Sequence, residues 1–140
     1  MIIDASVAFK WIVSEEDTEL AVRLLAMGEL YAPTLLVTEV ANGLWKKIRR
    51  EQIDRSVSFS DEIQRLPRLV DLVDERAHVA RALEIGRELQ HAIYDCVYLA
   101  LAEARDDVVV SADAKLAGKA AGTPWAERLT GLAEAIARGG

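Results

Sequence analysis

The chain has 140 residues, 51% of them hydrophobic and 29% charged, a globular balance that excludes a disordered or collagen-like chain and favours one domain. Lys and Arg number 17 against 23 Asp and Glu, and the net charge of −6 argues against a polybasic nucleic-acid binder, although acidic residues could still hold cations. A single cysteine, Cys96, excludes an internal disulfide and a cysteine-built zinc or iron–sulfur site. No apolar run approaches the roughly 18 residues of a membrane span, and no signal-type stretch opens the sequence. We therefore expect a cytoplasmic protein with a single domain over residues 1–140 and no membrane association.

The first half of the chain alternates short apolar strands with helical patterns. The best-marked helix runs from Thr34 to about Arg50, where apolar side chains recur every four residues. It ends in basic residues, which suit the negative end of a helix dipole. In chain order we expect a strand over 2–3, helices over 7–13 and 18–27, a strand over 30–32, the helix over 34–50, and a helix over 56–66 that Pro67 closes.

The second half continues this alternation. Residues 93–104 are apolar nearly all round and predict a helix that is buried on most sides. Val108–Ser111 is the clearest strand, because it is β-branched and apolar, as in a parallel sheet. The other expected elements are a weak strand over 69–72, a helix over 77–89 with Val79, Leu83 and Ile85 facing inward, helices over 115–121 and 129–137, and an edge strand near 125–129.

Strands that alternate with helices indicate an α/β fold with a central, mostly parallel sheet of four or five strands and helices on both faces. In such a fold each helix runs opposite to its flanking strands. A helix that follows a strand therefore starts at the carboxyl end of that strand. A helix that leads directly into a strand starts at the same edge of the sheet, so these helix starts and the strand ends lie together. Ligands bind at that edge, outside the carboxyl ends of the strands.

Four acidic residues are predicted to share this edge. They are Asp4 after the first strand, Glu39 early in the helix after the second, Asp95 at the start of the helix over 93–104, and Asp113 after the strand over 108–111. The same rule places Asp106 and Asp107 at the opposite edge. Asp4 and Asp95 are embedded in apolar sequence, where a carboxylate needs a partner.

Crowded carboxylates repel one another, so ionising all four is unfavourable unless a cation binds. Hard oxygen ligands suit Mg²⁺ or Mn²⁺, which also bind phosphate oxygens. Such ions activate water and stabilise the attacking and leaving oxygens of an in-line phosphoryl displacement. The residues therefore indicate metal-dependent phosphodiester hydrolysis. Each acid taken alone is more often a helix cap or a solvated surface group, so the joint placement of all four carries this inference.

Four segments resemble, in the same order, the motifs of the PIN-domain family: Asp4-Ala5-Ser6, Glu39-Val40-Ala41-Asn42, Tyr94–Ala102 and Ser111–Leu116. The chain length and the Glu-x-x-Asn and Asp-x-x-Tyr segments look most like the VapC-type toxin branch of that family. The resemblance covers nearly the whole chain. It implies a compact parallel sheet, a Mg²⁺- or Mn²⁺-dependent endoribonuclease acting as the toxin of a toxin–antitoxin pair, a cognate VapB-type antitoxin and a homodimer.

Carried onto this chain, the resemblance makes Asp4, Glu39, Asp95 and Asp113 the catalytic and metal-binding residues. Ser6, Asn42 and Ser111 would support them. Residues 54–75 carry no motif and are expected to form a variable surface for substrate recognition. The antitoxin is expected to lie in an apolar groove between the helices over 7–13 and 36–48 and to place a basic side chain near the acids.

Two smaller features are open to two interpretations each. The only dense basic patch either contacts RNA phosphates or is a solvated helix end; it consists of Lys46, Lys47, Arg49 and Arg50, with Arg55 beyond. His91 lies four residues before Asp95 and could share a helix face with it as a metal ligand, but an oxygen-rich magnesium site rarely needs imidazole.

Two other classes of function are weighed against the nuclease. A phosphatase with a strand-end aspartyl nucleophile would need a second Asp two residues after the first, where this chain has Ser6. The main alternative is a non-catalytic PIN-like or receiver-like binding module. A receiver would need a phosphoacceptor Asp at the end of a middle strand, for which Asp71 is a poor candidate. A degenerate PIN-like scaffold would be expected to lack some of the four acids.

Overall fold

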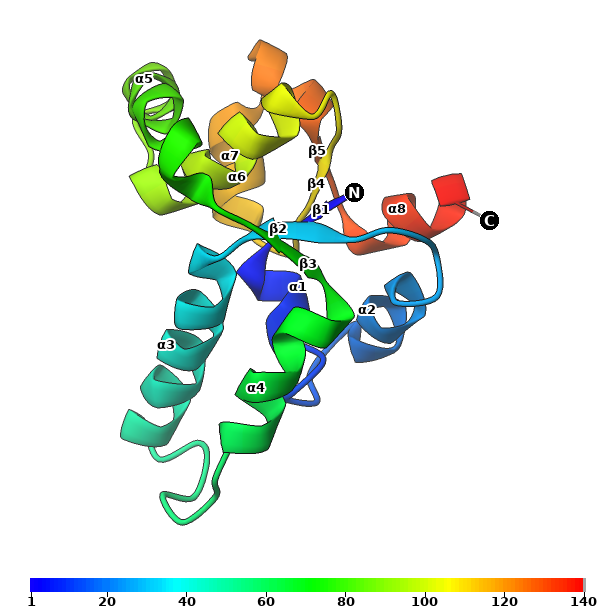
Figure 1. Cartoon of the computed structure of the whole chain (residues 1–140), viewed down its shortest axis with the longest axis vertical. Coiled ribbons are helices and arrows are strands. Elements are labelled where there is room, and N and C mark those ends of the chain that lie inside the picture. The colour runs from blue at the N-terminus through cyan, green and yellow to red at the C-terminus, as the bar shows by residue number, and fades with distance from the viewer. Residues whose placement is uncertain (140) are drawn as a thin grey trace.

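The structure is a computed structural model that describes residues 1–139, and it shows five parallel strands between layers of helices (Figure 1). The strands are β1 (Ile2–Ile3), β2 (Tyr31–Pro33), β3 (Asp71–Val73), β4 (Val109–Val110) and β5 (Leu129–Thr130). They lie in the order β3-β2-β1-β4-β5, and every neighbouring pair is parallel. The predicted α/β fold with a central parallel sheet is confirmed.

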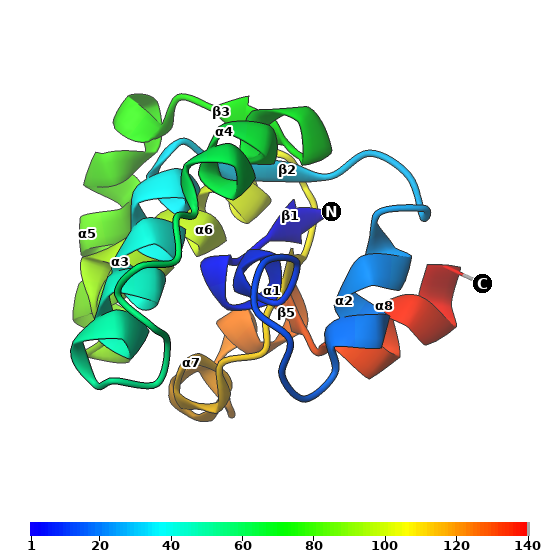
Figure 2. The same cartoon turned by 90° about the horizontal axis from the view of Figure 1, so that it is seen from below.

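The helices cover both faces of this sheet. They are α1 (Ala5–Phe9), α2 (Thr18–Leu24), α3 (Leu35–Arg49), α4 (Ser60–Leu69), α5 (Val79–Leu89), α6 (Ile93–Ala104), α7 (Ala114–Ala120) and α8 (Leu132–Gly139), with 3-10 turns η1 (Glu75–His78) and η2 (Pro124–Arg128). Helices α1, α3 and α4 lie on one face and α5, α6 and α7 on the other, while α2 packs against α8 beside the sheet (Figures 1 and 2). None of the helices within residues 1–139 is long and apolar enough to cross a bilayer.

Helix α6 forms the centre of the core, as its sequence predicts. Its residues from Cys96 to Ala102 are all buried, and it contacts β1, β2, β4 and α5. A helix without a polar face must be enclosed on most sides, and the strands β1 and β4, also fully buried, supply the opposing surface. The first turn of α6, which carries Asp95, is thereby held at the carboxyl edge of the sheet.

The predicted inward face of α5 is wrong for two of its three residues. Val79 and Leu83 are 44% and 47% exposed, whereas Ile85 is buried as predicted, together with Ala82 and Gly86. A Cβ on Gly86 would come within 2.7 Å of Ile93 Cδ1, so the glycine allows α5 to approach the start of α6 closely. Close packing through Ala82 and Gly86, in addition to burial of large apolar residues, therefore selects the face that α5 buries.

Several element boundaries also differ from prediction. Helix α1 ends at Phe9 instead of residue 13, because the Lys10 ammonium donates to Glu15 Oε1 (3.1 Å) and to the Glu16 carbonyl (2.7 Å) and folds the following residues around it. Helix α4 begins at Ser60 and passes through Pro67 to Leu69. Proline has no backbone N–H, so α4 lacks the hydrogen bond that residue 67 would otherwise donate to the carbonyl four residues earlier, and the helix ends two residues later.

Candidate active site

Asp4 is the most buried acidic residue of the site and joins the carboxyl ends of β1 and β4. The residue is 5% exposed, and its Oδ2 accepts hydrogen bonds from Ser111 Oγ (2.6 Å) and Ser6 Oγ (2.9 Å). Ser6 Oγ also accepts from the Ala112 backbone N–H at 3.0 Å. The two serine hydroxyls therefore hold the Asp4 carboxylate from two different segments, helix α1 and the loop after β4.

The pKa of Asp4 is raised above its ordinary value. Burial is the main cause, because it disfavours the charged carboxylate, and the negative charge of Asp95 adds to the effect. The hydrogen bonds from Ser111 and Ser6 oppose this shift, since they stabilise the carboxylate. Asp4 and Asp95 thus affect each other's electrostatic environment although they are distant in sequence.

Glu39, in the second turn of α3, is held by a tyrosine from α6. The Tyr98 hydroxyl donates to Glu39 Oε1 at 2.8 Å. Burial raises the pKa of Glu39 to about 7, the Tyr98 hydrogen bond opposes that shift, and the charges of Asp4 and Asp95 add to it. Sequence reasoning gave Tyr98 no role at the site, although its position three residues after Asp95 places both on one face of α6.

Asp95 and Asp113 complete the predicted set in different ways. Asp95 Oδ2 lies 2.5 Å from Nε2 of His91. The Asp113 carboxylate caps α7 by accepting from the Lys115 N–H (2.8 Å), while the Asp113 N–H donates to Ser111 Oγ (3.0 Å). Asp113 is therefore connected to Asp4 through the Ser111 hydroxyl, but its charge does not contribute to the pKa shifts of Asp4 and Glu39.

The donor chemistry of this edge fits a hard divalent cation. Asp4, Glu39 and Asp95 offer carboxylate oxygens, and their mutual repulsion is what a bound cation would relieve. In residues 1–139, however, no three His, Cys, Asp or Glu side chains are already gathered as the ligands of one ion. Each predicted carboxylate is instead hydrogen-bonded to a neighbouring protein group.

A small cavity of about 210 Å³ extends from this site between α1 and α3. Ser6, Glu39, Asn42 and Lys46 line its polar side, and the Phe9 ring lies 3.1 Å from where a Cβ on Gly43 would be. Asn42, predicted to support the acids, therefore adjoins Glu39. The hollow between these two helices is therefore small and partly polar, and not the apolar groove that was expected to receive the antitoxin.

The predicted basic patch is divided by the geometry of α3. Lys46 reaches the cavity beside Glu39 and Asn42. The neighbouring Lys47 lies over the Phe9 ring, 5.9 Å from its centroid, and 4.0 Å from Glu15 Oε2. Successive residues on a helix point about 100° apart, so only one of the two lysines can face the acidic site.

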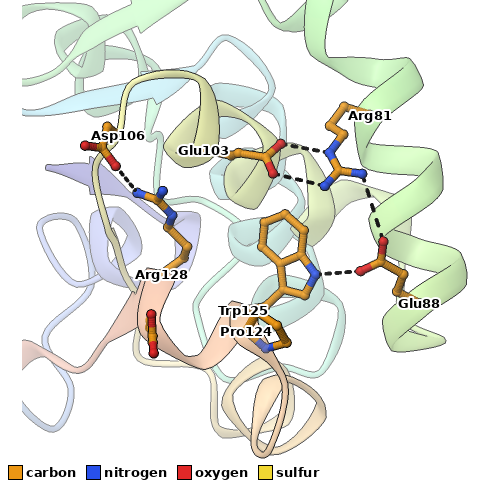
Figure 3. A pocket seen from close by; sticks show the side chains of 8 residues that line it. Arg81, Glu88, Glu103, Asp106, Pro124, Trp125 and Arg128 are labelled. Carbon is orange, nitrogen blue, oxygen red and sulfur yellow. Dashed lines mark hydrogen bonds and ion pairs between the residues drawn. The ribbon is translucent and has the colours of Figure 1, made fainter.

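The opposite edge of the sheet has different chemistry. Asp107 pairs with the amino group of Met1 (2.9 Å) and Asp106 pairs with Arg128 (2.9 Å), which confirms the prediction that these two acids lie away from Asp4. A cavity of about 560 Å³ opens there beside Trp125 (Figure 3). Arg81, which lines this cavity, makes two hydrogen bonds to Glu103 and lies over the Trp125 ring. The charge of Arg81 is therefore neutralised by Glu103, and that of Arg128 by Asp106.

The fold and the site together define an α/β protein whose sheet carries, at its carboxyl edge, one buried and two partly buried carboxylates that repel one another. The PIN domain family model matches residues 1–122, and the chain belongs to that family. It is 29% identical over 122 residues to Ribonuclease VapC3 of Pyrobaculum aerophilum, an alignment that covers 85% of this chain and 93% of that protein. The crystal structure of PAE2754 from Pyrobaculum aerophilum has a TM-score of 0.72 to it at 20% identity, covering 98% of this chain and 93% of that one.

Proposed function

We propose that this protein is a Mg²⁺- or Mn²⁺-dependent endoribonuclease, the toxin of a toxin–antitoxin pair. The observation that carries the proposal is the convergence of buried Asp4 with Glu39 and Asp95 at the carboxyl edge of the sheet. Membership of the PIN domain family and the similarity to a protein named Ribonuclease VapC3 support it. The non-catalytic module has no comparable support, because a degenerate PIN-like scaffold would be expected to lack some of the four acids, and this chain has all of them.

Asp4, Glu39, Asp95 and Asp113 are the residues that would hold the metal. The bound ion supplies water activation and neutralises charge during in-line displacement at phosphorus. Ser6 and Ser111 orient Asp4, and Tyr98 orients Glu39. Because its pKa is about 7, Glu39 can also take up or release a proton at neutral pH. Asn42 offers an amide donor beside Glu39 for the substrate backbone.

The test of this proposal is RNA cleavage by the purified protein. We expect cleavage of a structured RNA in Mg²⁺ or Mn²⁺, complete loss in EDTA, and recovery when excess Mg²⁺ is added back, because water is a poor nucleophile until a cation lowers its pKa. Gel mapping of the products locates the cut. Undiminished cleavage in EDTA would contradict the metal-dependent mechanism, and no cleavage in either metal would contradict the nuclease.

The basic patch is proposed to bind the RNA backbone without taking part in the chemistry. Replacing Lys46, Lys47, Arg49 and Arg50 by Ala should weaken RNA binding and flatten its salt dependence, by about 0.7 in log–log slope for each lost phosphate contact to a single strand. Of the single variants, Lys46→Ala should have the larger effect and Lys47→Ala the smaller, because only Lys46 lines the cavity beside Glu39.

The check is the affinity for a labelled RNA at several salt concentrations, together with the single-turnover cleavage rate at saturating protein. The rate should stay nearly unchanged in both lysine variants. If the rate collapses while affinity holds, the patch belongs to the catalytic machinery and the assignment is wrong.

The same proposal includes a cognate VapB-type antitoxin and a homodimer. The exposed apolar groove of this chain, about 420 Å³, lies between α3 and α4 and includes Trp45, Ile48, Phe59 and Ile63. An amphipathic antitoxin helix in it would run alongside α3 and could bring a basic side chain to the acidic edge. In the cleavage assay, adding the protein encoded beside this gene should stop the reaction. Persistent cleavage by a stable complex would contradict this role.

A further inference from the structure

His91 contacts an acidic residue of the site but lies outside the predicted catalytic set. Its Nε2 is 2.5 Å from Asp95 Oδ2, and its side chain is 12% exposed. An ionised carboxylate can only accept hydrogen bonds, so the contact with ionised Asp95 requires the His91 tautomer or charge state in which Nε2 carries a proton. The sequence placed both residues on one helix face, but His91 precedes α6 and belongs to the turn that joins α5 to it.

The position of His91 is built by the tight turn between α5 and α6. Gln90 has a left-handed backbone (φ 50°), and the His91 N–H donates to the Gly86 carbonyl at 3.3 Å. A Cβ on Gly86 would lie 3.3 Å from the His91 carbonyl and 2.7 Å from Ile93 Cδ1. The turn is therefore compact, and it presents the imidazole to Asp95 from a defined direction.

The same hydrogen-bonding pattern recurs on all three converging carboxylates. The serine hydroxyls bind Asp4 at Oδ2, Tyr98 binds Glu39 at Oε1, and His91 binds Asp95 at Oδ2. Among residues 1–139, the second oxygen of each carboxylate has no side-chain hydrogen bond. One oxygen of each acid thus fixes its orientation, and the other stays available to a ligand.

We propose that His91 is a positioning residue of the acidic site, which orients Asp95 so that Oδ1 is the oxygen offered to a divalent cation. The inference rests on the proposed function. Groups that hydrogen-bond to metal ligands fix their orientation, and removing such a partner commonly lowers metal affinity by about 10- to 100-fold. In this arrangement the imidazole does not bind the metal itself: it acts through Asp95.

Mn²⁺ affinity of the full chain, measured by electron paramagnetic resonance titration without RNA, tests this role. We expect His91→Ala to weaken Mn²⁺ binding by about tenfold or more, and His91→Gln, whose Nε2 amide can donate to Asp95, to retain most of the affinity. His78→Ala is the matched control, since His78 lies in η1 and makes no side-chain hydrogen bond among the described residues. Circular dichroism and thermal unfolding establish that each variant is folded.

Three results would overturn the inference. Unchanged Mn²⁺ affinity in folded His91→Ala would give His91 a structural role only. Tighter binding would mean that the imidazole competes with the metal for Asp95, and equal losses in His91→Ala and His91→Gln would exclude orientation by a donated hydrogen bond.

The proposed function can fail separately. If His91→Ala weakens Mn²⁺ binding but the wild-type chain cuts no RNA, the role of His91 is supported and the nuclease is contradicted. A wild-type chain that binds no Mn²⁺ would overturn both.

Discussion

Asp4→Asn is expected to reduce RNA cleavage by at least about 100-fold while the protein stays folded. The substitution keeps the shape of the side chain and its acceptor oxygen for Ser6 and Ser111, but it removes the charge that would hold the metal. Asp95→Asn should cause a similar loss. Asp106→Asn is the matched control, because Asp106 pairs with Arg128 at the opposite edge of the sheet.

The thermal stability of the Asp4→Asn protein distinguishes the loss of a catalytic charge from the loss of the folded structure. The pKa of Asp4 is raised on folding, so ionised Asp4 favours the unfolded state. The stabilisation from protonated Asp4 is fully present below the pKa that Asp4 has in the unfolded chain. It is lost as the pH rises through the higher pKa that Asp4 has in the folded protein. At neutral pH without divalent metal, Asp4→Asn should therefore melt no lower than wild type. Full cleavage by Asp4→Asn in the single-turnover assay would rule out the proposed mechanism.

Mn²⁺ affinity is expected to fall about fivefold from pH 7 to pH 6 and about ninefold more from pH 6 to pH 5, or about 50-fold in all. Glu39 has a pKa of about 7 in the folded protein against an ordinary value of 4.5, so it is mostly protonated at pH 5 and must lose its proton before it can bind a cation. Calorimetric titrations in buffers of different ionisation enthalpy should detect the released proton.

The control for this pH dependence is Glu39→Gln, which keeps both histidines and removes the carboxyl group. It should bind Mn²⁺ more weakly at pH 7 and lose most of the slope between pH 5 and pH 7. Without metal, the free energy of unfolding of the wild type should fall from about pH 4.5 to pH 7 relative to Glu39→Gln, because Glu39 loses its stabilising proton over that range. Equal slopes in the two proteins would exclude Glu39 as the titrating group.

The fold class and the edge that carries the acids were accessible from the sequence alone. Short β-branched runs such as Val108–Val110 alternate with helical patterns, and the parallel topology then places the ends of strands and the starts of helices together. Helix α6 was predicted with its observed bounds, because an apolar pattern without a polar face leaves little ambiguity. These features depend on local composition and on rules of chain direction.

Tertiary structure decided which partners each acidic residue has. The hydrogen bonds from Ser111 to Asp4 and from Tyr98 to Glu39 join residues 107 and 59 positions apart, and no local pattern specifies them. The buried face of α5, and the tight turn that carries His91, depend on how closely Gly86 lets α5 and the start of α6 approach. Sequence periodicity indicates which residues of an element are buried. The distances between side chains depend on how the elements pack against one another, which only the assembled core determines.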